Sequence, residues 1–207
     1  MRLCIDLCSG RGGFSQAFVQ AGWEVVTVDI ESKFNPTICA DVTALSAEKI
    51  EEATAKKSFA AYDRIIVLAS PPCERFSLAC RTWPKKGVQK AMETVGACLE
   101  LIAEIKPNYW VLENPKARLR WFLGTPKGTI RLSDYGTPYL KPTDYWGNVP
   151  LPFLKATVPP RMYLRPMKHD LKTPSPIYLS GADKAGRSKL PAGFSRAILK
   201  AVSVEAA

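Results

Sequence analysis

The sequence predicts an α/β protein in which a mostly parallel sheet carries helices on both faces and a small irregular basic region is added. Three observations lead to this prediction. Short apolar runs at residues 3–7, 23–30, 62–68 and 109–112 have the length and composition of buried strands. Helical patterns at residues 14–21 and 89–105 alternate with these runs, as they do in βαβ units. Residues 138–176 then hold nine of the 17 prolines, with aromatic and basic residues between them.

The first 30 residues have the order of a nucleotide-binding βαβ unit. Strand 3–7 leads into the glycine-rich turn Cys8-Ser9-Gly10-Arg11-Gly12-Gly13, and strand 23–30 carries Asp29 at its end. Glycines let a backbone approach a ligand closely, and an acid in this position accepts hydrogen bonds from ribose hydroxyls. The turn lacks the third glycine of the dinucleotide fingerprint, which argues against NAD. Asp29 can also be an ordinary residue at the end of a strand.

Residues 37–56 and 89–105 complete the predicted core. Residues 37–40 form a third strand, followed by Asp41-Val42, and the acid Asp41 could hold an adenine amino group. Ser46 is expected to cap a helix that runs to about Lys56. The apolar stripe of helix 89–105 indicates a core face and not a site.

Two strand ends carry the candidate reaction centre. Strand 62–68 leads into Ser70-Pro71-Pro72-Cys73, and strand 109–112 leads into Glu113-Asn114. Helix 89–105 is the right-handed crossover between them, so the two strands should be neighbours and Cys73 should face Glu113 across one cleft. Two prolines restrict the backbone and predict a stiff turn that presents the thiol. Each residue alone is weak evidence, since proline turns with an incidental cysteine and acids at strand ends are both common.

Composition limits the class of protein and its partners. The net charge is +10, and residues 113–207 carry 16 basic and 6 acidic side chains, against 13 of each in residues 1–112. A one-sided basic surface favours a polyanion partner, although a generic basic protein has the same composition. The six cysteines form no CxxC pair and the single histidine, His169, has no cysteine cluster near it, so we expect no metal and a reducing cytoplasm. No apolar run reaches 18 residues and the first residues do not resemble a signal peptide, so we expect no membrane association.

Basic side chains around aromatic residues predict the surface that contacts nucleic acid. They lie after the Pro-Pro-Cys turn and in the proline-rich region, where a solvated loop or a flank wrapping the sheet is the alternative. The predicted contacts are Arg75, Ser77, Arg81, Lys85, Lys86, Lys141, Arg161 and Arg165.

Three motifs, in this order and spacing, resemble those of the DNA (cytosine-5)-methyltransferase family. They are Asp6-Leu7-Cys8-Ser9-Gly10-Arg11-Gly12-Gly13-Phe14, Ser70-Pro71-Pro72-Cys73-Glu74-Arg75-Phe76-Ser77 and Glu113-Asn114. The resemblance covers roughly residues 1–115 and implies a class I methyltransferase sheet of Rossmann-like type. It also implies S-adenosylmethionine as the methyl donor and double-stranded, cytosine-containing DNA as the partner.

The resemblance also implies roles for individual residues. Cys73 is the nucleophile that attacks C6 of the ring, which activates C5, and Glu113 is the group on N3. Asn114 and Ser77 support the catalytic loop, and the nearest match to the family's Gln-x-Arg-x-Arg segment supplies Arg118 and Arg120. The implied cofactor residues are Asp6, Cys8, Ser9, Gly10, Gly12, Gly13, Asp29, Ile30, Asp41, Val42 and Pro71.

The chain departs from the family in several places. Cys8 stands where an aromatic residue is usual, Pro115 replaces a valine, and the late Gly-Asn motif is not seen beside the last helix. We therefore expect residues 1–115 to be the cofactor-binding and catalytic core. Residues 116–180 form a small nucleic-acid-recognition region, and residues 181–207 hold a helix that packs back on the core, in a monomer or weak oligomer.

RNA is an alternative substrate, and a non-catalytic nucleic-acid-binding protein is an alternative of another class. An amino-methyltransferase fits less well, because Ser70 and Cys73 stand where it has an Asp or Asn and an aromatic residue.

Overall fold

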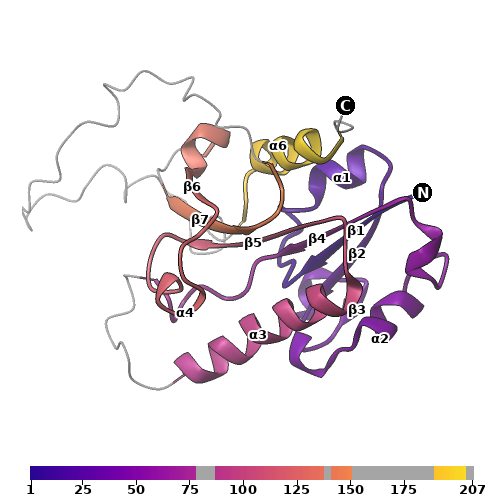
Figure 1. Ribbon diagram of the computed structural model, residues 1–207, viewed down its shortest axis with the longest axis horizontal. Helices are drawn as coiled ribbons and strands as arrows, with labels where there is room; N and C mark the ends of the chain where they lie inside the picture. The colour runs from indigo at the N-terminus through magenta and orange to yellow at the C-terminus, as the bar shows by residue number, and fades with distance from the viewer. Residues whose placement is uncertain (78–86, 138–140, 151–188, 204–207) are drawn as a thin grey trace, which may run out of the picture.

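The computed structural model describes residues 1–77, 87–137, 141–150 and 189–203. In these residues seven strands form one sheet, in the order β3-β2-β1-β4-β5-β7-β6 (Figure 1). Strands β1 to β5 are parallel, β7 runs antiparallel to β5, and β6 runs antiparallel to β7. The predicted mostly parallel sheet is therefore confirmed. The strands are β1 (Arg2–Leu7), β2 (Glu24–Asp29), β3 (Ile38–Cys39), β4 (Arg64–Ala69), β5 (Tyr109–Pro115), β6 (Gly128–Arg131) and β7 (Pro142–Gly147).

Alternating side chains of the central strands supply two separate cores, one on each face of the sheet. In β1, Leu3, Ile5 and Leu7 belong to one core and Cys4 to the other. In β4, Ile65 and Val67 join the first core and Ile66 joins the second. Both faces of a strand are apolar when helices cover both sides of a sheet, which is why these strands read as continuous apolar runs.

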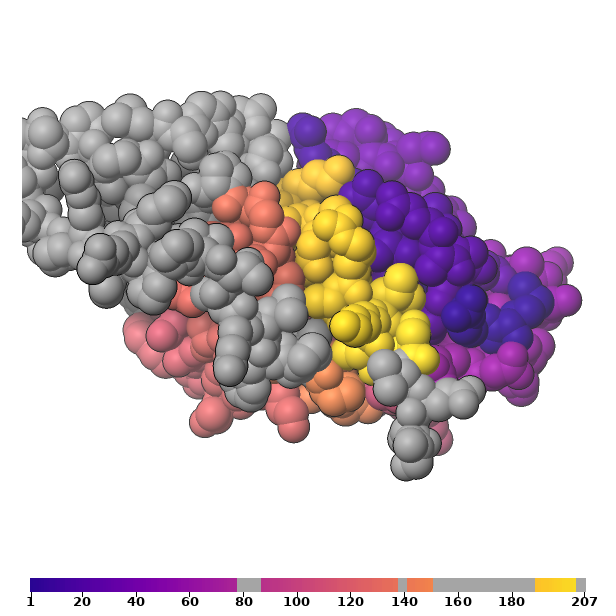
Figure 2. Space-filling model, turned by 90° about the horizontal axis from the view of Figure 1, so that it is seen from above, coloured from indigo at the N-terminus to yellow at the C-terminus, as the bar shows by residue number. Residues whose placement is uncertain are grey.

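Helices α1 (Gln16–Gln20) and α6 (Ala192–Ser203) pack together on one face (Figure 1). Figure 2 looks onto this face, where α6 in yellow lies between the indigo N-terminal elements and the later segment in salmon. The ring of Phe194 stacks on Phe14 at 5.6 Å and meets the edge of Tyr135 at 5.2 Å. Ser195 Oγ donates to the Phe14 carbonyl at 2.6 Å and accepts from the Ala17 N–H at 3.0 Å. The last helix thus holds the segment that follows the glycine-rich turn.

Helices α3 (Val88–Ile105) and α2 (Ala47–Glu52) cover the other face (Figure 1). The buried stripe of α3 includes Val95, Cys98 and Ile102, as the predicted core face requires. Ser46 caps α2 by accepting from the Lys49 N–H at 3.4 Å. This helix is shorter than predicted, because it ends at Glu52 and not near Lys56.

The chain after residue 115 contributes to the same sheet. Strand β7 lies within residues 138–176, where the sequence predicted irregular structure. Helix α4 (Arg120–Leu123), strand β6 and the 3-10 segment Leu132–Tyr135 lie between the predicted core and that stretch. The sheet therefore continues past the predicted boundary at residue 115, whereas residues 151–180 of the predicted recognition region lie outside the described residues. Within the described ranges, no helix is long and apolar enough to cross a membrane, and no three His, Cys, Asp or Glu side chains group as a metal site.

Candidate active site

The carboxyl ends of β4 and β5 lie side by side and bring the two catalytic motifs together. Ala69 pairs with Leu112, so Ser70-Pro71-Pro72-Cys73 and Glu113-Asn114 leave the sheet at the same level. Ser70 Oγ donates to Glu113 Oε1 at 2.8 Å, and Asn114 Nδ2 donates to the Pro71 carbonyl at 3.0 Å. These two hydrogen bonds join the turn that carries Cys73 to the strand end that carries Glu113.

The turn that carries Cys73 is stabilised by hydrogen bonds within the turn and by contacts with residues outside it. The Cys73 carbonyl accepts from the N–H groups of Phe76 at 3.0 Å and Ser77 at 2.9 Å. The side chain of Phe76 is fully buried and anchors the turn in the core. Arg118 bonds the turn through its N–H to the Phe76 carbonyl at 3.2 Å and through Nη1 to the Ser77 carbonyl at 2.6 Å. Arg118 therefore contacts the backbone of the catalytic turn.

The pKa values of Glu113 and Cys73 are both raised by their surroundings. Burial raises the pKa of Glu113, while the Lys141 ammonium and the Ser70 hydroxyl lower it. Glu113 Oε2 is buried and has no hydrogen-bond partner among the described residues. Burial and the charge of Glu113 raise the pKa of the Cys73 thiol, and Lys141 lowers it. Burial therefore shifts both groups toward their protonated forms, the carboxylic acid of Glu113, which can donate a hydrogen bond, and the thiol of Cys73.

Arg120 contacts strands β6 and β7, on the side of β5 away from β4. Its guanidinium makes an ion pair with the fully buried Asp144 of β7, and Nη2 donates to Thr129 Oγ1 at 2.8 Å. The structure gives Arg120 a partner in the sheet and gives Arg118 a partner in the catalytic turn. The catalytic role that the resemblance implies for Arg120 stays a prediction.

The ends of β1 and β2 form the edge where the cofactor residues were predicted. The Asp29 carboxylate accepts from the Gly10 N–H through Oδ2 at 2.7 Å and from the Glu31 N–H through Oδ1 at 2.9 Å. Gly10 and Gly12 have φ of +50° and +66°, and open space surrounds the place where a Cβ would stand on each. The turn therefore leaves its backbone accessible at Gly10 and Gly12. Gly13 has another reason to be glycine, since a Cβ there would meet the Leu190 carbonyl oxygen at 2.4 Å.

Asp6 links the cofactor edge to the catalytic edge. Its side chain is fully buried, and Oδ2 accepts from Ser15 Oγ at 2.6 Å. Burial raises the pKa of Asp6 to about 7, and the charges of Asp29 and Glu113 contribute to the same rise. Asp6 Oδ1 has no hydrogen-bond partner among the described residues. A buried acceptor of this kind is satisfied when a ligand brings a donor or a positive charge.

The residues at this edge fit S-adenosylmethionine. A fixed carboxylate at Asp29 suits a ribose, and Ile30 beside it is 64% exposed, so its side chain is available to an adenine face. The side chain of Val42 is buried, and Asp41 Oδ1 accepts from the Thr43 N–H at 3.0 Å, which lowers the Asp41 pKa. The Cys8 backbone has φ of +57°, and its thiol lies beside Cys98, which raises the Cys8 pKa.

Other predicted site residues divide between described and undescribed parts of the chain. The Ser9 N–H donates to the Val28 carbonyl at 3.0 Å, which ties the glycine-rich turn to β2. Arg75 is exposed, and its side chain lies against Gly87 at the start of α3. Lys141, predicted as a nucleic-acid contact, acts on Cys73 and Glu113. Arg81, Lys85, Lys86, Arg161 and Arg165 lie outside the described residues.

Two hydroxyl groups were missed by reasoning from the sequence. Ser70 donates a hydrogen bond to Glu113 and Ser15 donates one to Asp6, and neither serine was assigned a role. Ser70 could have been found, because it stands at the end of β4, next to the strand whose end carries Glu113. Ser15 gives no comparable signal, since a serine at a helix start is expected to cap the helix.

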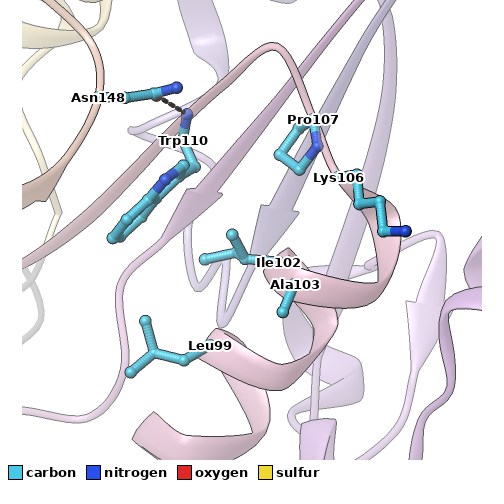
Figure 3. Close-up of a pocket in the computed structure, with 7 residues that line it drawn as sticks. All are labelled: Leu99, Ile102, Ala103, Lys106, Pro107, Trp110 and Asn148. Carbon is cyan, nitrogen blue, oxygen red and sulfur yellow. Dashed lines mark hydrogen bonds between the residues drawn. The ribbon is translucent and has the colours of Figure 1, made fainter.

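A hollow of ≈ 380 Å³ lies at the opposite edge of the sheet, near the start of β5 (Figure 3). The side chain of Trp110 forms one wall, and the backbone N–H of Trp110 donates to Asn148 Oδ1 at 2.8 Å. None of the predicted site residues lines this hollow. The described candidate site is therefore the carboxyl edge, where β1, β2, β4 and β5 end.

Comparison with protein families identifies the class to which this fold and site belong. The model of the C-5 cytosine-specific DNA methylase family matches residues 3–120. This match spans the cofactor turn, the Pro-Pro-Cys turn and Glu113-Asn114. The chain belongs to the C-5 cytosine-specific DNA methylase family.

Individual relatives resemble part of the chain. Type II methyltransferase M.XorII of Xanthomonas oryzae pv. oryzae is 32% identical over 124 residues, which are 54% of this chain and 28% of that protein. Type II methyltransferase M.AquIA of Picosynechococcus sp. is 29% identical over 131 residues, which are 58% of this chain and 51% of that protein. This chain therefore spans about half or less of the length of these two relatives.

A solved structure supports the fold. It is described as a DNA modification methyltransferase encoded within a prophage (E. coli), and it matches with a TM-score of 0.51 at 20% identity. The match covers 71% of this chain and 46% of that one. Together with the strand order, it confirms the predicted class I methyltransferase sheet.

Proposed function

We propose that this chain transfers a methyl group from S-adenosylmethionine to C5 of cytosine in double-stranded DNA, through a covalent bond between Cys73 and C6. One observation carries the proposal: the Pro-Pro-Cys turn and Glu113-Asn114 are joined by hydrogen bonds at two neighbouring strand ends. A thiol and a buried carboxylic acid are the two groups that activation of a cytosine ring requires. Membership of the family supports the reaction, and the names of the relatives support DNA as substrate.

Cys73 starts the reaction as a thiolate. The Cys73 sulfur adds to C6 of cytosine, the C5–C6 π electrons move into the ring, and C5 becomes nucleophilic as part of an enamine. After C5 has gained its methyl group, it loses its proton to a base. The electron pair released reforms the C5–C6 double bond and expels the Cys73 thiolate. The nucleophile is therefore regenerated in each cycle.

Glu113 stabilises the ring while the thiolate is attached. Burial raises the pKa of Glu113 and so favours the protonated acid, which can donate a hydrogen bond to N3, where negative charge develops. The Ser70 hydroxyl holds Oε1, which leaves Oε2 as the oxygen without a partner among the described residues. We assign N3 of the flipped base to Oε2.

Asp29, Ile30, Asp41, Val42 and the turn at Gly10 and Gly12 would hold the cofactor. When bound, S-adenosylmethionine supplies an electrophilic methyl group beside C5. Asp6 provides a buried carboxyl whose Oδ1 has no hydrogen-bond partner among the described residues and could accept from a donor or face a positive charge. Its position next to both edges favours a role in orienting the bound cofactor toward the reaction centre.

The target base must leave the duplex before Cys73 can reach C6. Arg75 and Ser77, on the catalytic turn, are proposed to contact the backbone around the flipped nucleotide. Trp121 of α4 is 69% exposed. The ring of the next residue, Phe122, packs on the ring of Phe76 in the catalytic turn, with centroids 6.1 Å apart. An exposed indole next to a catalytic turn suits stacking on a base. Recognition of the target by residues 116–180 and a monomeric or weakly oligomeric state belong to the same proposal.

Transfer of tritiated methyl groups from S-adenosylmethionine tests the function. Duplex DNA and RNA of the same sequence are offered separately to the wild type and to Cys73→Ala. We expect labelled DNA with the wild type and no label above background with the variant. Robust transfer by Cys73→Ala would overturn the covalent mechanism, and label on RNA alone would replace DNA as the substrate.

A further inference from the structure

The segment at residues 116–124 lies between β7 and the catalytic turn. On one side, the Lys116 N–H donates to a β7 carbonyl at 2.8 Å, and the Gly124 carbonyl accepts from a β7 indole at 3.4 Å. Midway between them, Arg120 makes the ion pair with β7 described above. These three residues follow one another at intervals of four, so they attach the segment to β7 from end to end. The sheet therefore supports this segment independently of the catalytic turn.

The other side of the segment contacts the catalytic turn. The ring of Phe122 packs on that of Phe76, and Leu119 is fully buried in the core that also holds Phe76. Arg118 donates from its backbone N–H to the Phe76 carbonyl at 3.2 Å and from Nη1 to the Ser77 carbonyl at 2.6 Å. The second bond is short and carries the guanidinium charge, which makes such bonds roughly twice as strong as neutral ones. Arg118 thus ties the turn to a segment that β7 holds in place.

The peptide group between Phe76 and Ser77 connects Arg118 to Cys73. Its carbonyl accepts from the Arg118 N–H, and its N–H donates to the Cys73 carbonyl at 2.9 Å. Ser77 is therefore bonded on both sides, by Cys73 through its N–H and by the Arg118 guanidinium through its carbonyl. A displacement of Ser77 would be passed on to the backbone of Cys73.

We propose that Arg118 is a positioning residue, which holds the catalytic turn so that the Cys73 sulfur reaches C6 of the cytosine ring. This inference rests on the proposed function, and it replaces the catalytic role that the resemblance implies for Arg118. In this role the guanidinium touches neither the ring nor the cofactor. It acts through the backbone of Phe76 and Ser77, with the segment at residues 116–124 as its support on β7.

Hydrogen exchange without DNA or S-adenosylmethionine tests whether Arg118 holds the turn. Mass spectrometry follows the peptide that contains the Phe76 and Ser77 amides in the wild type, in Arg118→Met and Arg118→Ala, which remove the guanidinium, and in Arg118→Lys. The neutral variants should exchange about tenfold faster in this peptide, the size expected for loss of a charged hydrogen bond, and like the wild type elsewhere. Arg118→Lys retains a charged donor and should restore most of the protection.

Arg64→Met is the matched control for both measurements. Arg64 Nη1 also donates to a backbone carbonyl, that of Val202, at 2.5 Å, but it does so from the first residue of β4, at the opposite edge of the sheet. Its loss should leave the exchange of the catalytic turn unchanged. Circular dichroism identifies the variants that fold.

Methyl-transfer kinetics test whether the held turn serves the chemistry. In Arg118→Met, kcat should fall by roughly 10²-fold, since a small misplacement of a reacting group has an effect of this size. The KM values for DNA and S-adenosylmethionine should stay close to those of the wild type, because Arg118 binds neither. Arg118→Lys should recover most of kcat, and Arg64→Met should keep it.

Unchanged exchange in the turn overturns the inference, and together with a lower kcat it returns Arg118 to direct contact with the ring. Faster exchange with an unchanged kcat, faster exchange throughout the chain, or loss of folding in both neutral variants also overturns it, because each limits Arg118 to a structural role. The exchange measurement requires no methyl transfer, so its failure leaves the proposed function standing. Conversely, absence of methyl transfer by the wild type to any nucleic acid overturns the proposed function without altering the exchange of the turn.

Discussion

The cofactor edge and the catalytic edge are built in different ways. At the cofactor edge, Asp29 is held by Gly10 and Glu31, and Asp6 by Ser15, so most contacts join residues within the first 31 positions. At the catalytic edge, Ser70 meets Glu113 and Arg118 meets Ser77, across more than 40 positions in each case. The first edge follows from one local motif, whereas the second exists only after the sheet has assembled. Variants at the catalytic edge should therefore affect chemistry and folding more than variants at the cofactor edge.

The largest expected effect is that of Glu113→Gln on catalysis. The amide keeps the shape of the acid but cannot be a proton donor of comparable strength, so methyl transfer should fall by roughly 10²–10⁴-fold. Turnover with tritiated cofactor measures the loss, and calorimetry should find cofactor binding unchanged. Glu100→Gln, an exposed change on α3, is the control. Turnover within about threefold of the wild type would remove Glu113 from the mechanism.

Arg120→Ala should be the most destabilising of the variants considered. It leaves Asp144, which is fully buried, without its ion-pair partner, and such losses cost about 3–5 kcal/mol. Urea denaturation followed by circular dichroism measures the free energy of unfolding. Arg131→Ala breaks the more exposed pair with Asp134 and should cost less than about 1 kcal/mol. Equal costs for the two variants would show that the buried pair does not stabilise the later strands.

Asp6→Asn tests the cofactor edge through the dependence of stability on pH. The pKa of Asp6 is about 7 in the folded chain, against an ordinary value of 3.8. The folded state therefore binds the proton more tightly, and the stability present below pH 3.8 is lost as the pH rises to about 7. The loss is on the order of 2–4 kcal/mol for a shift of this size. Asp6→Asn should remove this part of the pH dependence in urea titrations between pH 4 and 8, and an unchanged slope would contradict the pKa shift.

Ser70→Ala should have the smallest effect, and it distinguishes positioning from chemistry. Loss of one hydrogen bond to a charged or polar partner corresponds to about 1–2 kcal/mol, or roughly tenfold in turnover. Because the Ser70 hydroxyl lowers the Glu113 pKa, the variant should also shift the alkaline limb of the pH–rate profile, where the protonated acid is lost, to higher pH. Ser70→Thr, which retains the hydroxyl, should preserve the profile. A Ser70→Ala profile identical to that of the wild type would limit Ser70 to packing.

The same contrast explains how much could be predicted from the sequence. Strands β1, β2, β4 and β5 were predicted within two or three residues of their bounds, because each is a buried apolar run. Strand β7 was missed, since its sequence begins with Pro142, ends with Gly147 and contains Asp144. Asp144 is tolerated in the sheet because Arg120 neutralises it, and that pairing cannot be read from either residue alone.

The candidate site also has a part that could be predicted from the sequence and a part that could not. The neighbourhood of Cys73 and Glu113 followed from one crossover helix between two strands, which is a topological rule with few exceptions. The position of Lys141 depends on β7, so its place near the carboxyl end of β5 could not be predicted while β7 was missed. The sequence motifs predict the candidate reacting groups, whereas contacts between distant parts of the chain, such as that of Arg118 with Ser77, hold them in place.

The most direct test of the central claim is capture of Cys73 on its substrate. Duplex DNA containing 5-fluorocytosine is incubated with S-adenosylmethionine and the wild type, Cys73→Ala or Cys39→Ala. Fluorine at C5 replaces the proton that must be lost, so the bond between sulfur and C6 should persist. We expect a complex that resists denaturing electrophoresis with the wild type and Cys39→Ala, joined through the Cys73 peptide, and none with Cys73→Ala. A complex formed by Cys73→Ala, or methyl transfer by the wild type without any covalent complex, would contradict this account.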